Sequence, residues 1–472
     1  MATLLTNNNQ PTTEIRFGWI LVLIFCSGLM VFREFDALSN LVFLSLTISM
    51  IALKTVNYQI SSFSSLFVLT SIIFYPFAVS LNLLLPIPAV RPDLWVHTYS
   101  SLIGYVYSIT FLIFGFGFVN LIFRNRSYKT IGNNTSPLLF NILLFSIIFL
   151  VVPIKIATGN YYHTTIGGFV EVSNWSNILG LSSWVSYCGL YLQMNRYFKT
   201  RAKIDGMFTL AMLFIPILLS LPSGNRESAI EHLPIAFILY LTFEKNLKLR
   251  IFALSTSLVM VTFLLIFMYA YRDSGITASN SVADQYSQVA DAEYISANQT
   301  PVQGLIERVS EFAALGRVID HVPKRTPHSG LHSMDTWWQI LIPGTFRPTE
   351  NKLNFNEPAE FSRDIGIAPG WWSSAPIMLK GDFFRRFGWT GLCFGMFLVG
   401  LSIRILDYCF RSKSDIFRII FYTIMAKTIW RLYSGSFLSL VVGFTRELLL
   451  AVLIAYVLTY VASLKGPKKL SR

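Results

Sequence analysis

Residues 99–123 read YSSLIGYVYSITFLIFGFGFVNLIF, an apolar run without a charged side chain. A helix that crosses the hydrocarbon core of a membrane needs about 20 such residues. Similar runs recur along the chain, which is 53% hydrophobic and only 13% charged. Soluble domains are about one quarter charged. The sequence therefore predicts an all-α polytopic membrane protein.

About twelve runs are read as transmembrane helices. They lie near residues 17–32, 37–53, 62–85, 99–123, 137–155, 175–193, 207–222, 228–243, 250–271, 388–408, 417–433 and 437–462. We expect the first to be a retained helix, because no basic segment precedes it as in a signal peptide. The predicted organisation is spans one to nine in 1–271, one large polar loop in 272–387, and spans ten to twelve with a basic tail in 388–472.

Basic residues are concentrated in alternate loops. The opposite short loops hold only Arg33, Arg91, Lys155 and Arg226. Because cytoplasmic loops carry the excess of Lys and Arg, both termini are predicted to be cytoplasmic and residues 272–387 to face outward, which means periplasmic or extracellular. This placement accounts for the net charge of +13. No nucleic-acid module accompanies that charge, so nucleic acid is not an expected partner.

The polar loop has its own helical pattern. Its residues Leu305, Val309, Phe312 and Ile319 recur at helical spacing, which predicts an amphipathic helix near 302–322. That helix either lies on the membrane surface or packs on the transmembrane bundle. The four cysteines all lie in or beside apolar spans, so no disulfide framework is expected in the loop.

The predicted outward turn Ser223-Gly224-Asn225-Arg226-Glu227 is a candidate anion site. If Ser223 caps the eighth helix, its free amides and Arg226 converge on one point that suits a phosphate. Alternatively, Arg226 only extends to the membrane interface. Glu227 and Glu231 are four residues apart and share a helix face, so either is a candidate general base or a structural partner of an arginine.

Further cations mark the predicted outer ends of other spans. They are Arg272, Lys427, Arg431 and Arg446. Together they could surround an outer cavity that attracts a diphosphate, although each could instead anchor its helix at the interface.

Tryptophan pairs mark the polar loop as a candidate sugar-binding region. The pairs are Trp337-Trp338 and Trp371-Trp372, and Arg347 and Lys352 lie between them. Flat aromatic rings beside polar groups suit sugars, but tryptophan also favours the membrane interface. His321, His328 and His332 lack a completing carboxylate pattern, so no metal site is predicted.

Three motifs occur in order between Ser223 and Gly400. They are Gly224-Asn225-Arg226, the segment from Ile342-Pro343 to Pro348 with Lys352, and Ser373-Ser374 with Gly381-Asp382 before Phe387-Gly388-Trp389-Thr390-Gly391. In these motifs and in its late outward loop the chain resembles the Wzy-type O-antigen and oligosaccharide repeat-unit polymerases. It departs from them at Asp382-Phe383-Phe384, where the family often has Glu and then Tyr, and at Leu353, where the family has Pro after Lys.

The resemblance implies a GT-C-like helical bundle and a glycosyltransferase of the bacterial inner membrane. Its substrates would be polyprenyl-diphosphate-linked oligosaccharides in the membrane lipid, which are joined to make O-antigen, capsule or exopolysaccharide. Its partner would be a chain-length co-polymerase. Without cofactor or metal, Arg226, Arg431 and Arg272 or Arg347 would stabilise the leaving diphosphate. Glu227, Asp382 or Glu231 would accept the proton. An O-antigen ligase and a lipid-linked oligosaccharide flippase remain alternatives.

Overall fold

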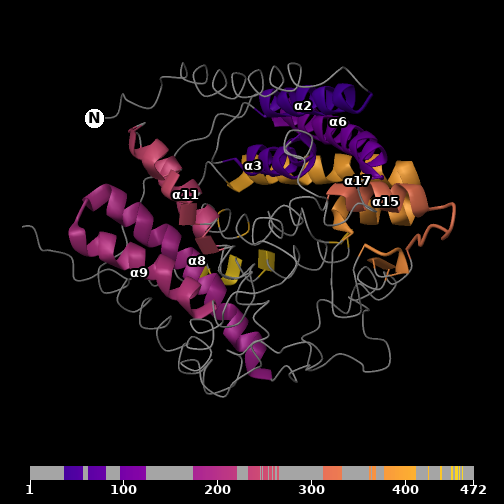
Figure 1. Cartoon of the computed structure of the whole chain (residues 1–472). Helices are drawn as coiled ribbons and strands as arrows, with labels where there is room; N and C mark the ends of the chain where they lie inside the picture. The colour runs from indigo at the N-terminus through magenta and orange to yellow at the C-terminus, as the bar shows by residue number, and fades with distance from the viewer. Residues whose placement is uncertain are drawn as a thin grey trace, which may run out of the picture.

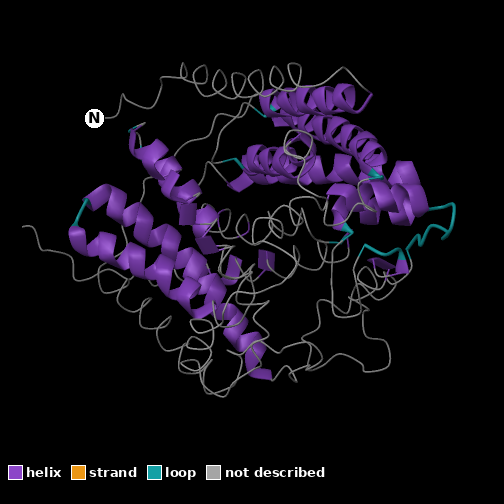
Figure 2. Ribbon diagram, in the orientation of Figure 1, coloured by secondary structure: helices purple, strands orange, loops and turns teal. Residues whose placement is uncertain are grey.

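The computed structural model describes part of the chain, and the description below concerns those residues only. They are 37–56, 62–80, 96–123, 174–220, 232–264 with short gaps, 312–331, 361–367 without 363, 377–410, and single residues between 422 and 460. This part is mostly helical and holds no strand, as Figure 2 shows. The all-α class predicted from the sequence is confirmed for the described residues.

Four of the described helical stretches are long and apolar enough to cross a membrane. They are Ala37–Thr55, Phe63–Ser80, Thr98–Phe123 and Met378–Tyr408. The ends of three of them lie within five residues of the runs predicted at 37–53, 62–85 and 99–123. An integral membrane protein is therefore the class that both sequence and structure support.

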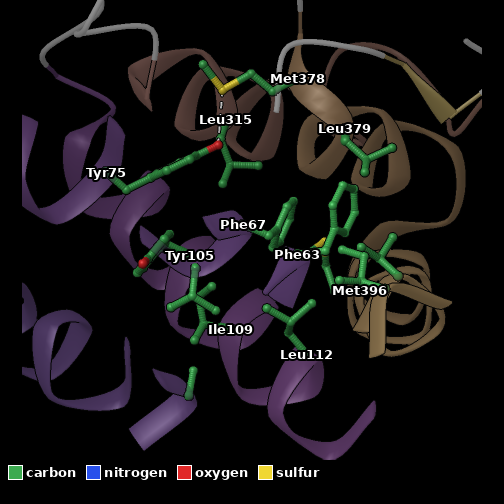
Figure 3. Close-up of a cluster of buried hydrophobic side chains, with 14 of the residues drawn as sticks. Phe63, Phe67, Tyr75, Tyr105, Ile109, Leu112, Leu315, Met378, Leu379 and Met396 are labelled. Carbon is green, nitrogen blue, oxygen red and sulfur yellow. Dashed lines mark hydrogen bonds between the residues drawn. The ribbon is translucent and has the colours of Figure 1, made fainter. Parts of the chain in front are cut away.

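The first group of helices forms around α6 (Thr98–Phe123). α2 (Ala37–Thr55), α3 (Phe63–Ile72) with the π-helical η1 (Ile73–Phe77), α15 (Phe312–His321) and α17 (Met378–Phe410) all contact one another or α6 (Figure 1). Phe67, Tyr105, Leu112 and Met396 are among the buried side chains at its centre, shown in Figure 3. A continuous apolar core thus joins the early helices to the late part of the chain.

Two glycines let the backbones of α6 and α17 touch. A Cβ atom at Gly115 would lie 2.4 Å from the carbonyl oxygen of Phe397, and one at Gly400 would lie 2.5 Å from that of Leu112. Small residues allow this close approach, which is how helices commonly associate in membranes.

Gly388 divides α17 into two helical segments. Its φ of 64° and ψ of −150° are not helical and are accessible mainly to glycine. The chain folds back there, because a Cβ at Gly395 would lie 2.6 Å from the ring of Phe383. In a straight helix these residues would be about 18 Å apart. The long second segment thus starts at Trp389, next to residue 388 where the sequence predicts the tenth span to begin.

α15 is the described part of the predicted amphipathic helix. It packs on the bundle, since a Cβ at Gly104 would meet the side chains of Leu315 and Ile319, and one at Gly316 would lie 1.9 Å from the carbonyl oxygen of His97. Of the two placements that the sequence left open, the structure has the packed one for residues 312–321. Leu305 and Val309 lie outside the described residues.

At its other end, α17 caps α3. Asp407 Oδ1 accepts a hydrogen bond from the Phe63 amide at 2.7 Å, and Oδ2 accepts from the Ser64 amide at 3.1 Å and from both Ser62 and Ser64 hydroxyls. A carboxylate at this position satisfies amides that the first helical turn leaves unpaired. α3 is thereby fixed to α17 across 343 residues of sequence.

The second group consists of α8 (Asn174–Thr200), α9 (Lys203–Ser220) and α11 (His232–Phe243). These helices form where the sequence predicts spans at 175–193, 207–222 and 228–243. Aromatic contacts hold the group together, with Phe198 of α8 against both Tyr240 and Phe243 of α11.

Candidate functional site

Asp382 is the one predicted site residue that lies among the described residues. The other predicted positions fall outside them, so nothing in the structure tests their roles. These positions are Arg226, Glu227, Glu231, Arg272, Trp337, Trp338, Arg347, Lys352, Trp371, Trp372, Arg431 and Arg446.

Asp382 forms a buried ionic cluster with Arg385 and Arg386, here called the Asp382 centre. Arg385 donates to Oδ1 from Nε at 3.1 Å and from Nη2 at 2.8 Å, and Arg386 donates to Oδ2 from Nε at 3.4 Å. The Phe437 amide donates to Oδ2 at 2.8 Å. The three side chains are at most 3% exposed. Removing Asp382 would take away the anion that both buried guanidinium groups share, so this carboxylate holds the cluster together.

The local sequence explains why these side chains meet. Positions 382, 385 and 386 are three and four residues apart and therefore share one helix face. The break at Gly388 frees the last carbonyl groups of this short segment. The amide of Ser329 donates to the Arg385 carbonyl at 3.2 Å and that of Gly330 to the Arg386 carbonyl at 3.0 Å. Loop 328–330 thus closes the segment that carries the cluster.

This geometry bears on the role of Asp382. Both of its carboxylate oxygens already accept hydrogen bonds, and the group is fully buried. A general base must come within hydrogen-bond reach of the hydroxyl that it deprotonates. The arrangement therefore suits a carboxylate that positions two guanidinium groups better than one that accepts a proton, and the predicted base role stays a prediction.

Lys380 lies on the same short segment and is buried among aromatic rings. Its Nζ lies 3.9 Å from the ring centroid of Tyr75 and 5.0 Å from that of Tyr105. The two rings stack at 4.9 Å, and the Tyr75 hydroxyl donates to Met378 Sδ at 3.0 Å (Figure 3). Ring faces attract an ammonium group, and Tyr75 of η1 and Tyr105 of α6 supply two such faces beside Nζ. The sequence did not single out Lys380, because its ring partners are distant along the chain.

A second polar cluster joins α6 to α15. His97 Nδ1 lies 2.6 Å from Asp320 Oδ2, and the Ser100 hydroxyl donates to Asp320 Oδ1 at 2.7 Å. His97 and Asp320 are 223 positions apart, so no local motif signals their contact. Because the contact fixes α15 to the start of α6, it holds the late polar segment on the bundle.

The histidines of the late segment have separate partners. His321 Nε2 lies 2.9 Å from the Thr326 hydroxyl, and His328 Nδ1 lies 3.3 Å from the Arg385 carbonyl oxygen. Burial lowers the pKa of His321, with the cations Arg325 and Arg317 adding to the effect. Among the described residues, no three metal-ligating side chains converge. His332 lies outside them.

His232, next to the predicted site residue Glu231, occupies the interface of α8 and α11. Its Nε2 lies 2.9 Å from the Ser186 hydroxyl, and its ring stacks on Tyr187 at 4.5 Å. A stacked and hydrogen-bonded imidazole explains how this polar side chain is buried inside an apolar helix group.

The chain was compared with protein-family models, curated proteins and solved structures, and nothing matches it in any of these comparisons.

Proposed function

We propose that the protein is a membrane glycosyltransferase that polymerises polyprenyl-diphosphate-linked oligosaccharide repeat units on the periplasmic face of the inner membrane. The observation that carries the proposal is the Asp382 centre. It places two buried arginines directly before the Gly388 break, within the third of the motifs by which the chain resembles the Wzy-type polymerases.

The proposed topology has about twelve spans, with both termini in the cytoplasm and residues 272–387 outside. Four described stretches suitable for spanning a membrane support it, together with the distribution of Lys and Arg. On this side cytosolic nucleotide sugars are out of reach. The donor must therefore arrive already attached to a lipid.

The proposed reaction forms one glycosidic bond and breaks one bond to phosphate. An acceptor hydroxyl oxygen attacks the anomeric carbon of the growing glycan, and the lipid diphosphate leaves with the electron pair of the broken C–O bond. Arg226 and Arg431, with Arg272, Arg347 or Arg446, would stabilise the charge that develops on the diphosphate.

The hydroxyl proton would pass to a carboxylate of the same face. Both oxygens of Asp382 already accept hydrogen bonds. Glu227 and Glu231 are therefore the preferred candidates for this general base. The tryptophan pairs and Lys352 would hold the sugars, and a chain-length co-polymerase would set how many units are added.

Product identity tests this proposal. Purified protein is incubated with lipid-linked repeat units, and the products are separated by length and identified by mass spectrometry. A ladder of lengthening glycan on lipid diphosphate is expected. A single transfer to a different acceptor would show a ligase instead, and lipid movement across the bilayer without a new glycosidic bond would show a flippase.

A further inference from the structure

The second helix group brings two basic segments together at one end. Arg201, in the turn between α8 and α9 (the loop at the left of Figure 2), has both guanidinium Nη atoms 3.4 Å from Glu244 Oε2, just after α11. Its guanidinium also lies 4.6 Å from the ring centroid of Phe198. Arg250 Nε donates to the Glu244 carbonyl at 2.6 Å. The turn and the segment 244–250 thus form one folded platform.

Cations dominate the surface of this platform, which we call the basic platform and define as Lys199, Arg201, Lys203, Lys248 and Arg250. The two nearby carboxylates among the described residues, Asp205 and Glu244, are buried at 1% and 6% exposure. Asp205 pairs with Arg196 at 2.8 Å and Glu244 with Arg201. Their charge therefore offsets those arginines, whereas Lys199, Lys203 and Lys248 are exposed.

An apolar surface begins immediately beside these cations. On α9, Ile204, Met207 and Leu210 are at least half exposed and follow Lys203 at helical spacing. After Lys248, the exposed side chains are Leu249, Ile251 and Phe252. The sequence predicts membrane spans at 207–222 and 250–271, so in the proposed topology these apolar side chains face lipid tails and the cations beside them lie at the level of the headgroups.

We propose that the basic platform binds the headgroups of anionic phospholipids. Clustered Lys and Arg at the end of membrane helices attract negatively charged lipid, and the net negative charge of an anionic headgroup complements this surface. Because Asp205 and Glu244 hold the turn and the following segment in place, the cations are presented on an ordered surface. The inference does not depend on the proposed glycosyltransferase activity.

The test measures which lipids the full-length protein retains. Protein in mild detergent is equilibrated with equal amounts of phosphatidylglycerol and phosphatidylcholine with the same acyl chains, and native mass spectrometry counts the bound lipids. The wild type should prefer phosphatidylglycerol. The double variant K203Q/K248Q should lose about fivefold in that preference for each cation removed. The control K324Q/R325Q removes two exposed cations of the loop that follows α15 and should keep it.

Two further measurements address the wild type itself. At about 1 M NaCl the Debye length shrinks to ~3 Å, so the preference for phosphatidylglycerol should disappear. Millimolar inorganic phosphate should not displace the lipid. The proposal is overturned if wild type binds both lipids equally, if K203Q/K248Q behaves like the control, if the preference survives high salt, or if inorganic phosphate competes as well as the lipid.

Discussion

Replacing Asp382 by Asn tests whether its carboxylate holds the Asp382 centre together. The change keeps the shape of the side chain and removes its charge, so two guanidinium groups that are at most 3% exposed lose their anion. Breaking a buried ion pair from one side costs about 3–5 kcal/mol. Because the three groups are buried, solvent does not reduce this figure. We expect a loss of that size in unfolding free energy, measured by titrating the purified protein with SDS in mixed micelles.

The matched control is Asp364→Asn, which changes an exposed carboxylate of the same region and should stay within about 0.5 kcal/mol of wild type. A second variant separates lost charge balance from general damage. Adding Arg385→Met to Asp382→Asn removes one uncompensated cation, so the double variant should be more stable than the single one. A single variant as stable as wild type, or a double variant weaker by the sum of two losses, would refute the reasoning.

Gly388→Ala should destabilise the protein by about 1–3 kcal/mol, because the backbone conformation at residue 388 suits glycine alone. A Cβ atom at Gly117 would meet open space, so the control Gly117→Ala should be neutral or stabilising. Thermal unfolding of both variants tests this difference. Asp407→Ala should lower the free energy of unfolding by about 1–3 kcal/mol, because the first amides of α3 lose their acceptor. Amide hydrogen exchange should become faster in α3 alone. Unchanged exchange in α3 would contradict the capping role of Asp407. His321, whose pKa is lowered from 6.5, favours the neutral form in the folded state. Its contribution is therefore present above pH 6.5 and lost as pH falls through the lowered pKa, so His321→Gln should reduce the loss of stability on acidification, seen by thermal unfolding at several pH values.

The sequence located the helices better than their contacts. Apolar run length alone predicted 99–123, and the structure has α6 at Thr98–Phe123, because hydrocarbon thickness sets the length of such helices. The hydrophobic pattern of the sequence could not show that the chain reverses direction at Gly388, because glycine allows many backbone conformations and tertiary packing selects one of them.

In the candidate site, contacts between residues close in the sequence could be predicted, and contacts between distant residues could not. Asp382 was singled out from a motif, and its partners Arg385 and Arg386 could have been recognised from their spacing of three and four residues. The contact of His97 with Asp320 joins positions 223 residues apart, so it depends on the packing of α15 against α6, which no local signal encodes.

The length distribution of the glycan product tests the central claim most directly. Proteoliposomes containing wild type or Arg226→Ala receive the same lipid-linked repeat units, and the products are resolved on a gel over time. The account predicts a lengthening ladder from wild type and only unreacted single units from an equally abundant Arg226→Ala protein, because the leaving diphosphate loses its main proposed cation. The absence of any ladder from wild type would contradict the proposed function. Equal ladders from both proteins would contradict the role of Arg226.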